Sequence, residues 1–224
     1  EHKLKKALKI RSKKPTSSYQ SDEMDEMTDL YVEYCLGLIE KARENCQDLQ
    51  ILIEQKLDFS DYVPEGFGTA DLAIVGSGSG TLHVVDLKYG RGVVVSAEKN
   101  PQMMLYALGA LSLFDMLYDI RTISMHIVQP RVGNFSTYET TVNELLTWAE
   151  EELKPKAILA STGGGEFCAG DHCRFCRAKN QCRARAVKNL ELLKYEFQDP
   201  ALLTDDEIAE IIGLAEELSK WAGD

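Results

Sequence analysis

A short glycine-rich run between two apolar segments constrains the fold of this chain more than any other feature. Residues 69–75 (Thr-Ala-Asp-Leu-Ala-Ile-Val) and 81–89 (Thr-Leu-His-Val-Val-Asp-Leu-Lys-Tyr) flank Gly-Ser-Gly-Ser-Gly at 76–80. Two apolar runs around such a flexible loop are typical of a β-hairpin. A phosphate-binding loop is disfavoured, because the run lacks a Lys-Ser/Thr ending and no helix follows it. The segment therefore predicts two neighbouring antiparallel strands.

Strand and helix patterns alternate along the rest of the chain. The further strands are expected at 51–57 and 124–129. Apolar residues recur at helical spacing in 1–10, 24–44, 101–119, 143–160 and 204–221. This interleaving predicts an α/β fold. The expected domains are a core at 1–162, a Cys-rich metal-binding module at 163–195 and a C-terminal helix at 196–224.

Length and charge limit the class of protein. The chain has 224 residues, of which 44% are hydrophobic, enough for one sizeable core. Its formal net charge of −11 argues against a passive DNA-coating protein, although basic residues cluster near both ends. The first cluster is Lys3, Lys5, Lys6, Lys9, Arg11, Lys13 and Lys14, and the second is Arg174, Arg177, Lys179, Arg183, Arg185 and Lys188. Either cluster could bind nucleic acid or simply be a solvated face.

No apolar run approaches the length of a membrane span, and no signal-peptide pattern is present. We therefore expect a cytoplasmic protein with no membrane partner. Cytoplasmic thiols stay reduced, so the six cysteines need a reason other than disulfide formation.

Asp86 and Lys88 carry the strongest sign of chemistry. They stand two apart on an apolar segment that reads as a central strand, so both side chains point to one face. Charges there are costly unless they are paired or bound to a cation. Asp71, on the other strand of the hairpin, could stand beside Asp86, and two such carboxylates suit Mg²⁺ or Mn²⁺. A purely structural Asp–Lys ion pair is the alternative.

Gln102 and Tyr106 follow on the next predicted helix. Their i, i+4 spacing places the amide and the phenol on one helical face. The pair could equally be a surface glutamine and a packed tyrosine.

Three motifs, taken in order, resemble the RecB-like, Cas4-like branch of the PD-(D/E)XK nucleases. They are Gly68-Thr69-Ala70-Asp71, Asp86-Leu87-Lys88 and Gln102-Met103-Met104-Leu105-Tyr106. Together with Gln129-Pro130-Arg131, they are similar to a family of phage and prophage exonuclease-like proteins, over about residues 1–186. The resemblance implies a restriction-endonuclease-like core, a central mixed sheet flanked by helices. It also implies that Asp71 and Asp86 bind metal, that Lys88 is catalytic, and that Gln102 and Tyr106 support the site or contact DNA.

Two positions depart from the family pattern. Relatives often have a metal-binding histidine on a helix before the first strand, and His2 is the only candidate here. We expect the true equivalent to lie upstream of residue 1. The second acidic position is Asp86, where relatives often have Glu, which the motif permits.

A compact cysteine pattern, Cys168-x4-Cys173-x2-Cys176-x5-Cys182, follows a Gly-Gly-Gly linker. Cys-x2-Cys is a strong metal-ligand spacing, and four thiolates could bind Zn²⁺ or a [4Fe–4S] cluster. Inert core cysteines are the alternative. His172 could also be a ligand but is expected to face solvent. Cys35 and Cys46 lie in helical patterns and are expected to be packing residues.

The resemblance favours the iron–sulfur cluster over zinc. It assigns Cys173, Cys176 and Cys182 to the cluster, with a distant fourth cysteine that would precede Glu1. Cys168 is then a local substitute or an extra cysteine.

The sequence thus predicts a metal-dependent DNA exonuclease of phage-type recombination or DNA processing. The expected partners are DNA and phage recombination or replication proteins. One alternative is a non-catalytic DNA-binding or scaffold protein with a metal-stapled nuclease-like fold. Another is an unrelated α/β enzyme whose Asp-x-Lys is structural. The oligomeric state stays open.

Overall fold

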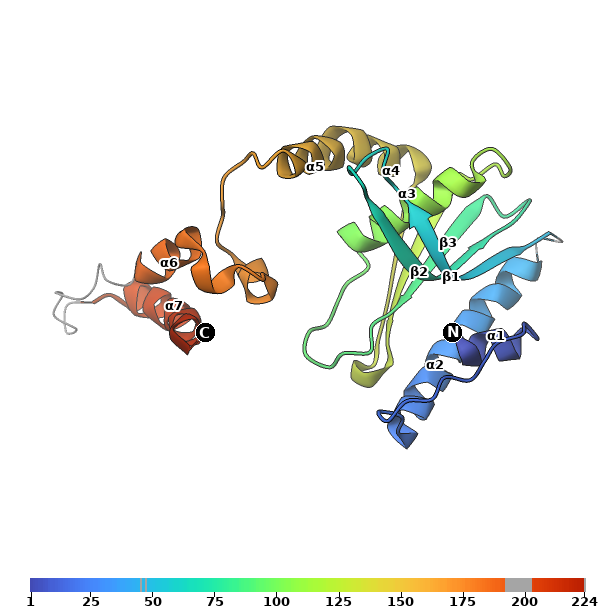
Figure 1. Ribbon diagram of the computed structural model, residues 1–224, viewed down its shortest axis with the longest axis horizontal. Coiled ribbons are helices and arrows are strands. Elements are labelled where there is room, and N and C mark those ends of the chain that lie inside the picture. Colours follow the sequence, from blue (N-terminus) through green and yellow to red (C-terminus); the bar gives the residue numbers. More distant parts are fainter. Residues whose placement is uncertain (45, 47, 192–202, 224) are drawn as a thin grey trace. The chain divides into compact units, whose positions relative to one another are not determined.

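The computed structural model describes residues 1–44, 46, 48–191 and 203–223 (Figure 1). The chain divides into two compact units, residues 1–163 and 164–224. Among the described residues, no helix combines the length and the apolar character needed to cross a bilayer.

The first unit is built on one mixed five-stranded sheet, with its strands in the order β1-β2-β3-β4-β5. The strands are β1 (Gln50–Asp58), β2 (Phe67–Val75), β3 (Thr81–Leu87), β4 (Thr122–Gln129) and β5 (Asn134–Thr141). All neighbours are antiparallel except β3 and β4, which are parallel because α3 (Pro101–Phe114) crosses between them. The expected α/β fold with a central mixed sheet flanked by helices is confirmed, and β3 is its middle strand.

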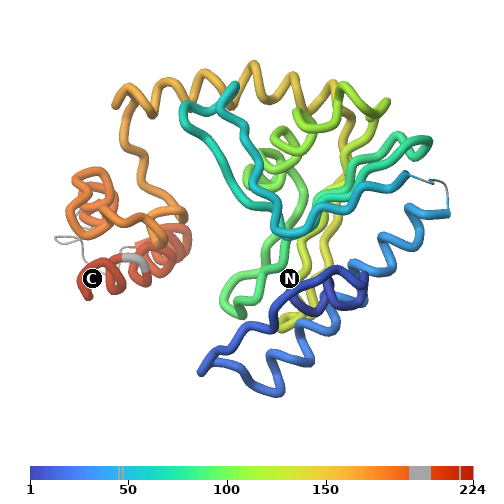
Figure 2. The backbone as a smooth tube through the Cα atoms, turned by 45° about the vertical axis from the view of Figure 1, so that its right-hand side comes forward, coloured from blue at the N-terminus to red at the C-terminus, as the bar shows by residue number. Residues whose placement is uncertain are grey.

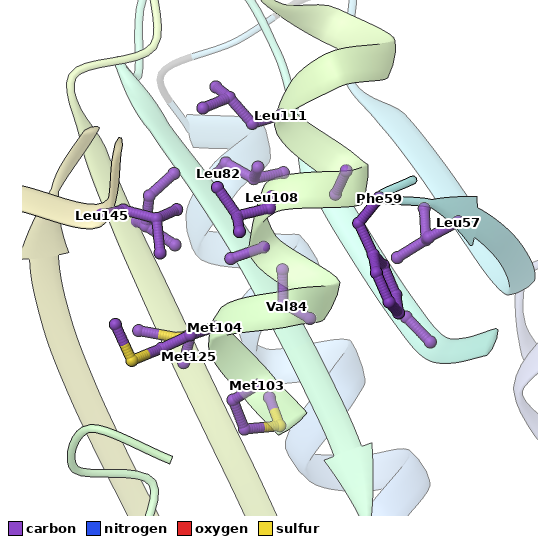
Figure 3. Close-up of a cluster of buried hydrophobic side chains, with 14 of the residues drawn as sticks. Leu57, Phe59, Leu82, Val84, Met103, Met104, Leu108, Leu111, Met125 and Leu145 are labelled. Atoms are coloured by element: carbon purple, nitrogen blue, oxygen red, sulfur yellow. The ribbon is translucent and has the colours of Figure 1, made fainter. Parts of the chain in front are cut away.

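One face of the sheet packs against α3. The buried cluster there includes Leu57, Leu82, Val84, Met103, Leu108 and Met125, as Figure 3 shows. Because β3 alternates its side chains, Leu82 and Val84 point into this cluster and Val85 points to the opposite face. The start of α3 is fixed by Asn100, whose side chain accepts hydrogen bonds from the backbone N–H groups of Gln102 and Met103.

The opposite face is covered by α1 (His2–Ala7) and α2 (Asp22–Glu44), which lie together on that side in both views (Figures 1 and 2). Leu4, Tyr31, Cys35 and Ile39 of these helices pack on β2 and β3. Cys35 is fully buried and Cys46 is 8% exposed, so the packing role expected for both is confirmed.

Three elements differ from the expected ones. Strand β5 was not predicted, because it is an edge strand in which polar residues occupy most positions. The helix expected to reach residue 119 ends at Phe114, and both Leu113 and Leu117 are exposed.

The single helix expected at 143–160 is divided. It consists of α4 (Val142–Trp148), a π-helical turn (Ala149–Leu153) and α5 (Lys154–Ser161). Pro155 has no backbone N–H to donate and its ring crowds the preceding turn, which accounts for the irregular hydrogen bonding just before it.

The second unit holds the cysteine pattern and two longer helices. Its elements are two short 3-10 turns (Asp171–Phe175 and Lys179–Gln181), α6 (Arg183–Leu190) and α7 (Asp205–Gly223). Helices α6 and α7 contact each other. Thr204 caps α7 by accepting from the backbone of Glu207, while the Glu207 carboxylate accepts from the backbone of Thr204. The expected end of the 163–195 module and the start of the expected 196–224 segment lie outside the described residues.

Candidate active site

Asp86 and Lys88 lie at the end of β3, on the face that α3 covers. Their side chains follow Leu82 and Val84 on that face, as the two-residue period of a strand predicts. The Lys88 Nζ is 2.9 Å from Asp86 Oδ2, and the Asp86 side chain is only 7% exposed. The Lys88 backbone N–H donates to the Val128 carbonyl across 2.9 Å, which holds this end of the strand against β4. A buried carboxylate and a partly buried ammonium are thus fixed at one point.

Asp71 enters the same region from β2. The pairing of β2 with β3 ends at Leu72 and Val85, so Asp71 and Asp86 are the next residues beyond the last paired positions. The Asp71 Oδ2 accepts a hydrogen bond of 2.6 Å from the backbone N–H of Leu87, the residue after Asp86. Where β2 and β3 separate, the Asp71 carboxylate therefore accepts from the Leu87 backbone N–H in place of a backbone carbonyl of β2. This contact brings the two predicted carboxylates to one place.

The environment of Asp71 favours its neutral form. Burial raises the pKa of the Asp71 carboxyl to about 6, and the negative charge of Asp86 acts in the same direction. The hydrogen bond from Leu87 opposes this shift, because it stabilises the ionised carboxylate. Raised carboxyl pKa values beside a second acidic group are common at functional sites.

The predicted pair on α3 completes the group. Lys88 Nζ donates to Gln102 Oε1 across 2.7 Å, and Gln102 Nε2 donates to the Tyr106 hydroxyl across 2.8 Å. The same amide nitrogen lies 3.4 Å from Asp86 Oδ1, a long contact. Gln102 thus connects lysine, carboxylate and phenol, so it is not an isolated surface glutamine. Tyr106 does pack against the core, as the alternative expected.

Gly68 explains why the first motif begins with glycine. A Cβ at this position would lie 2.5 Å from Tyr106 Cε1 and 3.2 Å from Tyr106 Cδ1. Any larger residue would therefore push the Tyr106 ring away from β2. Gly68 and Tyr106, which belong to separate motifs, are in direct contact.

Asp86 has an oxygen that suits a cation. Its Oδ2 is buried, and the cation that meets it in this structure is the Lys88 ammonium, whose Nζ is 2.9 Å away. No three His, Cys, Asp or Glu side chains of the described residues are grouped to hold a metal by themselves. Mg²⁺ is commonly bound through one or two carboxylates, with water and phosphate as its other ligands. Asp71 and Asp86 fit an ion of that kind.

Residues outside the predicted site hold the segment that follows Lys88. The Gln129 side chain accepts from the Val95 backbone N–H and donates to the Val93 carbonyl. Arg131 lies over the Tyr89 ring at 4.6 Å from its centroid and pairs with Glu23 of α2. Gln129 and Arg131 had been noted only as part of a resemblance. Glu23 had no local signal, because its partner is 108 residues away.

His2 is not part of the carboxylate group. It lies on α1, and its Nδ1 is 2.9 Å from the Ser12 hydroxyl. Nothing in the described residues supplies a histidine next to Asp71 and Asp86.

The four predicted cysteine ligands are not gathered into a metal site. Cys168 and Cys176 are exposed, Cys182 is partly buried and Cys173 is buried. The Cys173 sulfur accepts a 3.4 Å contact from the Gly170 backbone N–H. His172 is exposed, as expected, and its Nε2 is 3.0 Å from the Cys168 carbonyl. The arrangement of the described residues therefore does not by itself fit a cluster or a zinc ion.

Comparison with known proteins gave a family match over the whole sequence and a weak structural similarity. A family model described as "Protein of unknown function (DUF2800)" matches residues 1–224. A solved structure titled "Crystal structure of SSO0001" is similar at 17% sequence identity, covering 82% of this chain and 93% of that chain, with a TM-score of 0.34. At that TM-score the likeness carries no argument about activity.

Proposed function

We propose that this chain, which belongs to the DUF2800 family of proteins of unknown function, is a divalent-metal-dependent DNA nuclease that hydrolyses phosphodiester bonds. The observation that carries the proposal is that Asp71, Lys88 and Gln102 gather at the end of β3 around the buried Asp86 carboxylate. The resemblance to PD-(D/E)XK nucleases supports the same residues. Their roles below belong to the proposal.

Asp71 and Asp86 would hold the ion. When bound, Mg²⁺ or Mn²⁺ would supply an activated water and would offset negative charge on the phosphate. Asp71 must be ionised to bind it, so the raised pKa of Asp71 makes metal binding compete with protonation.

Lys88 would act on the phosphate. Its ammonium is positioned by Gln102 and by Asp86, so it can stabilise charge that develops on a phosphoryl oxygen. Tyr106 fixes the Gln102 amide, because the amide nitrogen donates to the phenol oxygen. Gln102 and Tyr106 are therefore positioning residues, and a loss of either should misplace Lys88.

The test is digestion of DNA by the purified protein. Linear duplex and single-stranded DNA should be degraded with Mg²⁺ or Mn²⁺, and EDTA should stop the reaction. Asp86→Ala should abolish digestion, while Asp61→Ala, an exposed aspartate on the loop after β1, should keep it. Full activity in Asp86→Ala would refute the assignment. Covalently closed circles should resist digestion if the enzyme is an exonuclease.

The alternative is a non-catalytic DNA-binding or scaffold protein with the same fold. The 2.9 Å ion pair favours it, because Lys88 can balance the Asp86 charge without any metal. It predicts DNA binding that EDTA does not change, with no digestion under any metal.

The cysteine segment is proposed, on its spacing and the resemblance, to bind a [4Fe–4S] cluster, with zinc as the alternative. Its thiols would have to rearrange on binding, since the described residues do not gather them. A nuclease of this kind would act in the cytoplasm, in phage-type recombination or DNA processing.

A further inference from the structure

A pocket of about 410 Å³ lies at the start of β3, where the last turns of α2 meet the glycine-rich loop between β2 and β3. His83 lines it from β3. Because side chains alternate along a strand, His83 points to the face opposite Asp86. The pocket is therefore at the other end of β3, and on the other face, from the proposed active site.

The charge in this pocket is positive. Lys41, in the last turn of α2, is exposed and has no ion-pair partner within 4 Å among the described residues. No aspartate or glutamate is among the described residues that line the pocket. The carboxylate of Asp48 is near the loop, but it accepts from the backbone and the hydroxyl of Ser77. One ammonium group is thus available to an anion.

The glycine-rich loop adds backbone donors to the pocket. The N–H groups of Gly78 and Ser79 donate to no acceptor in the described part of the chain. The angle φ is +87° at Gly78 and +63° at Gly80, and it is not positive at Ser79 between them. Turns of this kind form backbone nests that bind anions. Such a nest needs no following helix, unlike the nucleotide-binding loop that the sequence disfavours.

Hydrogen bonds behind the pocket fix the tautomer of His126. The Ser124 hydroxyl donates to Glu139 Oε1 across 3.1 Å, so its oxygen can only accept from His126 Nε2, which is also 3.1 Å away. Burial lowers the pKa of His126 to about 3, so the ring is neutral and its Nδ1 accepts. The Tyr34 hydroxyl, at 2.8 Å, supplies that hydrogen bond. His126 therefore carries its proton on Nε2.

This tautomer decides what His83 offers to the pocket. His126 Nε2 lies 3.2 Å from His83 Nδ1, so the Nδ1 of His83 is an acceptor. Burial lowers the pKa of His83 as well, and its neutral ring must then hold the proton on Nε2. That N–H meets no acceptor among the described residues. His83 is thus a hydrogen-bond donor to the pocket that it lines.

We propose that this pocket binds a phosphate group, which the Lys41 ammonium, the loop N–H groups of Gly78 and Ser79, and His83 Nε2–H would hold. Leu38 and Ala42 give the rest of the lining an apolar side, and the volume is that of a small-molecule site. The phosphate can therefore belong to a small phosphomonoester or be the free ion. The inference does not depend on the proposed nuclease function, because Asp71, Asp86 and Lys88 do not line this pocket.

The first experiment titrates the full chain with phenyl phosphate at fixed ionic strength in EDTA and records NMR spectra. The amide signals of Gly78 and Ser79 should shift. The imidazole of His83 should titrate at a higher pH than in the free protein, because a nearby dianion favours the charged ring. Gly133, a glycine with positive φ in another turn, should not respond. Unchanged signals of Gly78, Ser79 and His83 at millimolar ligand would overturn the inference.

A matched pair of variants tests the role of Lys41. Lys41→Ala should weaken phenyl phosphate binding about tenfold, the effect of one charge-assisted hydrogen bond. Arg43→Ala removes a basic residue from the same last turn of α2 that does not line the pocket. It should change the affinity less than about twofold, because solvent screens an exposed charge that does not contact the ligand. Equal losses in the two variants would refute the site.

Two further ligands separate the parts of phenyl phosphate. Phenol lacks the anion and should leave Gly78 and Ser79 unchanged, and phenol binding as tight as that of phenyl phosphate would refute phosphate recognition. Inorganic phosphate should shift the same loop signals. Weaker binding of inorganic phosphate than of phenyl phosphate would assign the site to a phosphomonoester, and equal binding would assign it to the free ion.

Discussion

The ring of Tyr106 lies against Gly68 so closely that a Cβ at residue 68 would be 2.5 Å from Tyr106 Cε1. Strand β2 and helix α3 can therefore pack this closely only because Gly68 has no side chain. Since Tyr106 accepts the hydrogen bond from Gln102, this contact also sets the position of the amide that holds Lys88. A residue remote from the chemistry thus fixes the proposed catalytic lysine.

Gly68→Ala should disturb the site through Tyr106. Overpacking of this kind costs about 1–3 kcal/mol of unfolding free energy, and displacement of Tyr106 should lower the DNA digestion rate. Chemical denaturation and nuclease assays measure the two effects. Gly37→Ala is the matched control, because nothing lies within 4 Å of a Cβ there in the middle of α2. That variant should be neutral or gain up to about 1 kcal/mol. A Gly68→Ala protein with unchanged stability and rate would contradict the account.

Lys88→Ala should lower the turnover number by orders of magnitude with little change in DNA affinity, because the cation acts on charge that develops during the reaction. Lys56→Ala, which removes an exposed lysine of β1, should leave turnover unchanged. Rates at saturating DNA and separate binding titrations measure the two effects. If the loss appears only as weaker binding, Lys88 positions a phosphate and has no part in the chemical step.

Much of the site could be predicted from local periodicity. The two-residue period of a strand places Asp86 and Lys88 on one face, and the 3.6-residue period of a helix places Gln102 and Tyr106 together. The apolar neighbours of Asp86 correctly predicted a central strand. Each of these relationships depends only on residues within one element.

What could not be predicted depends on contacts between distant elements. The hydrogen bond from Leu87 to Asp71 exists because β2 and β3 separate at that point, which no local pattern encodes. The ion pair between Arg131 and Glu23 joins the turn after β4 to α2, 108 residues away in the sequence. Strand β5 could not be predicted from its own residues, because its strand conformation depends on pairing with β4.

The ionisation of Asp71 should make the free energy of unfolding depend on pH. Because its folded pKa is raised from 3.8 to about 6, the neutral carboxyl stabilises the metal-free fold below about pH 4. That contribution is lost as the pH rises through about 6. Asp71→Asn, which stays neutral, should therefore gain stability relative to the unsubstituted chain between pH 4 and 7, by at most about 3 kcal/mol.

Urea unfolding in EDTA across this pH range measures the difference. Asp58→Asn provides a control of opposite sign, because hydrogen bonds from Ser60 lower the pKa of Asp58. Its relative stability should fall as the pH rises through the acid range. An Asp71→Asn difference that is constant with pH would show that the carboxyl is not perturbed.

The cysteine segment gives the last prediction. Protein prepared without oxygen in the presence of iron and sulfide should be brown and absorb in the visible, and Cys176→Ser should be colourless. Cys35→Ser alters a buried cysteine of the first unit and should keep the colour. Binding should also stabilise the second unit against proteolysis, because metal binding supplies much of the folding energy of such modules. Cys168→Ser identifies the fourth ligand: loss of metal assigns Cys168, whereas no change assigns a cysteine outside this segment. Colourless anaerobic protein with stoichiometric zinc would refute the iron–sulfur choice, and protein that binds neither metal would leave Cys173 as a packing residue.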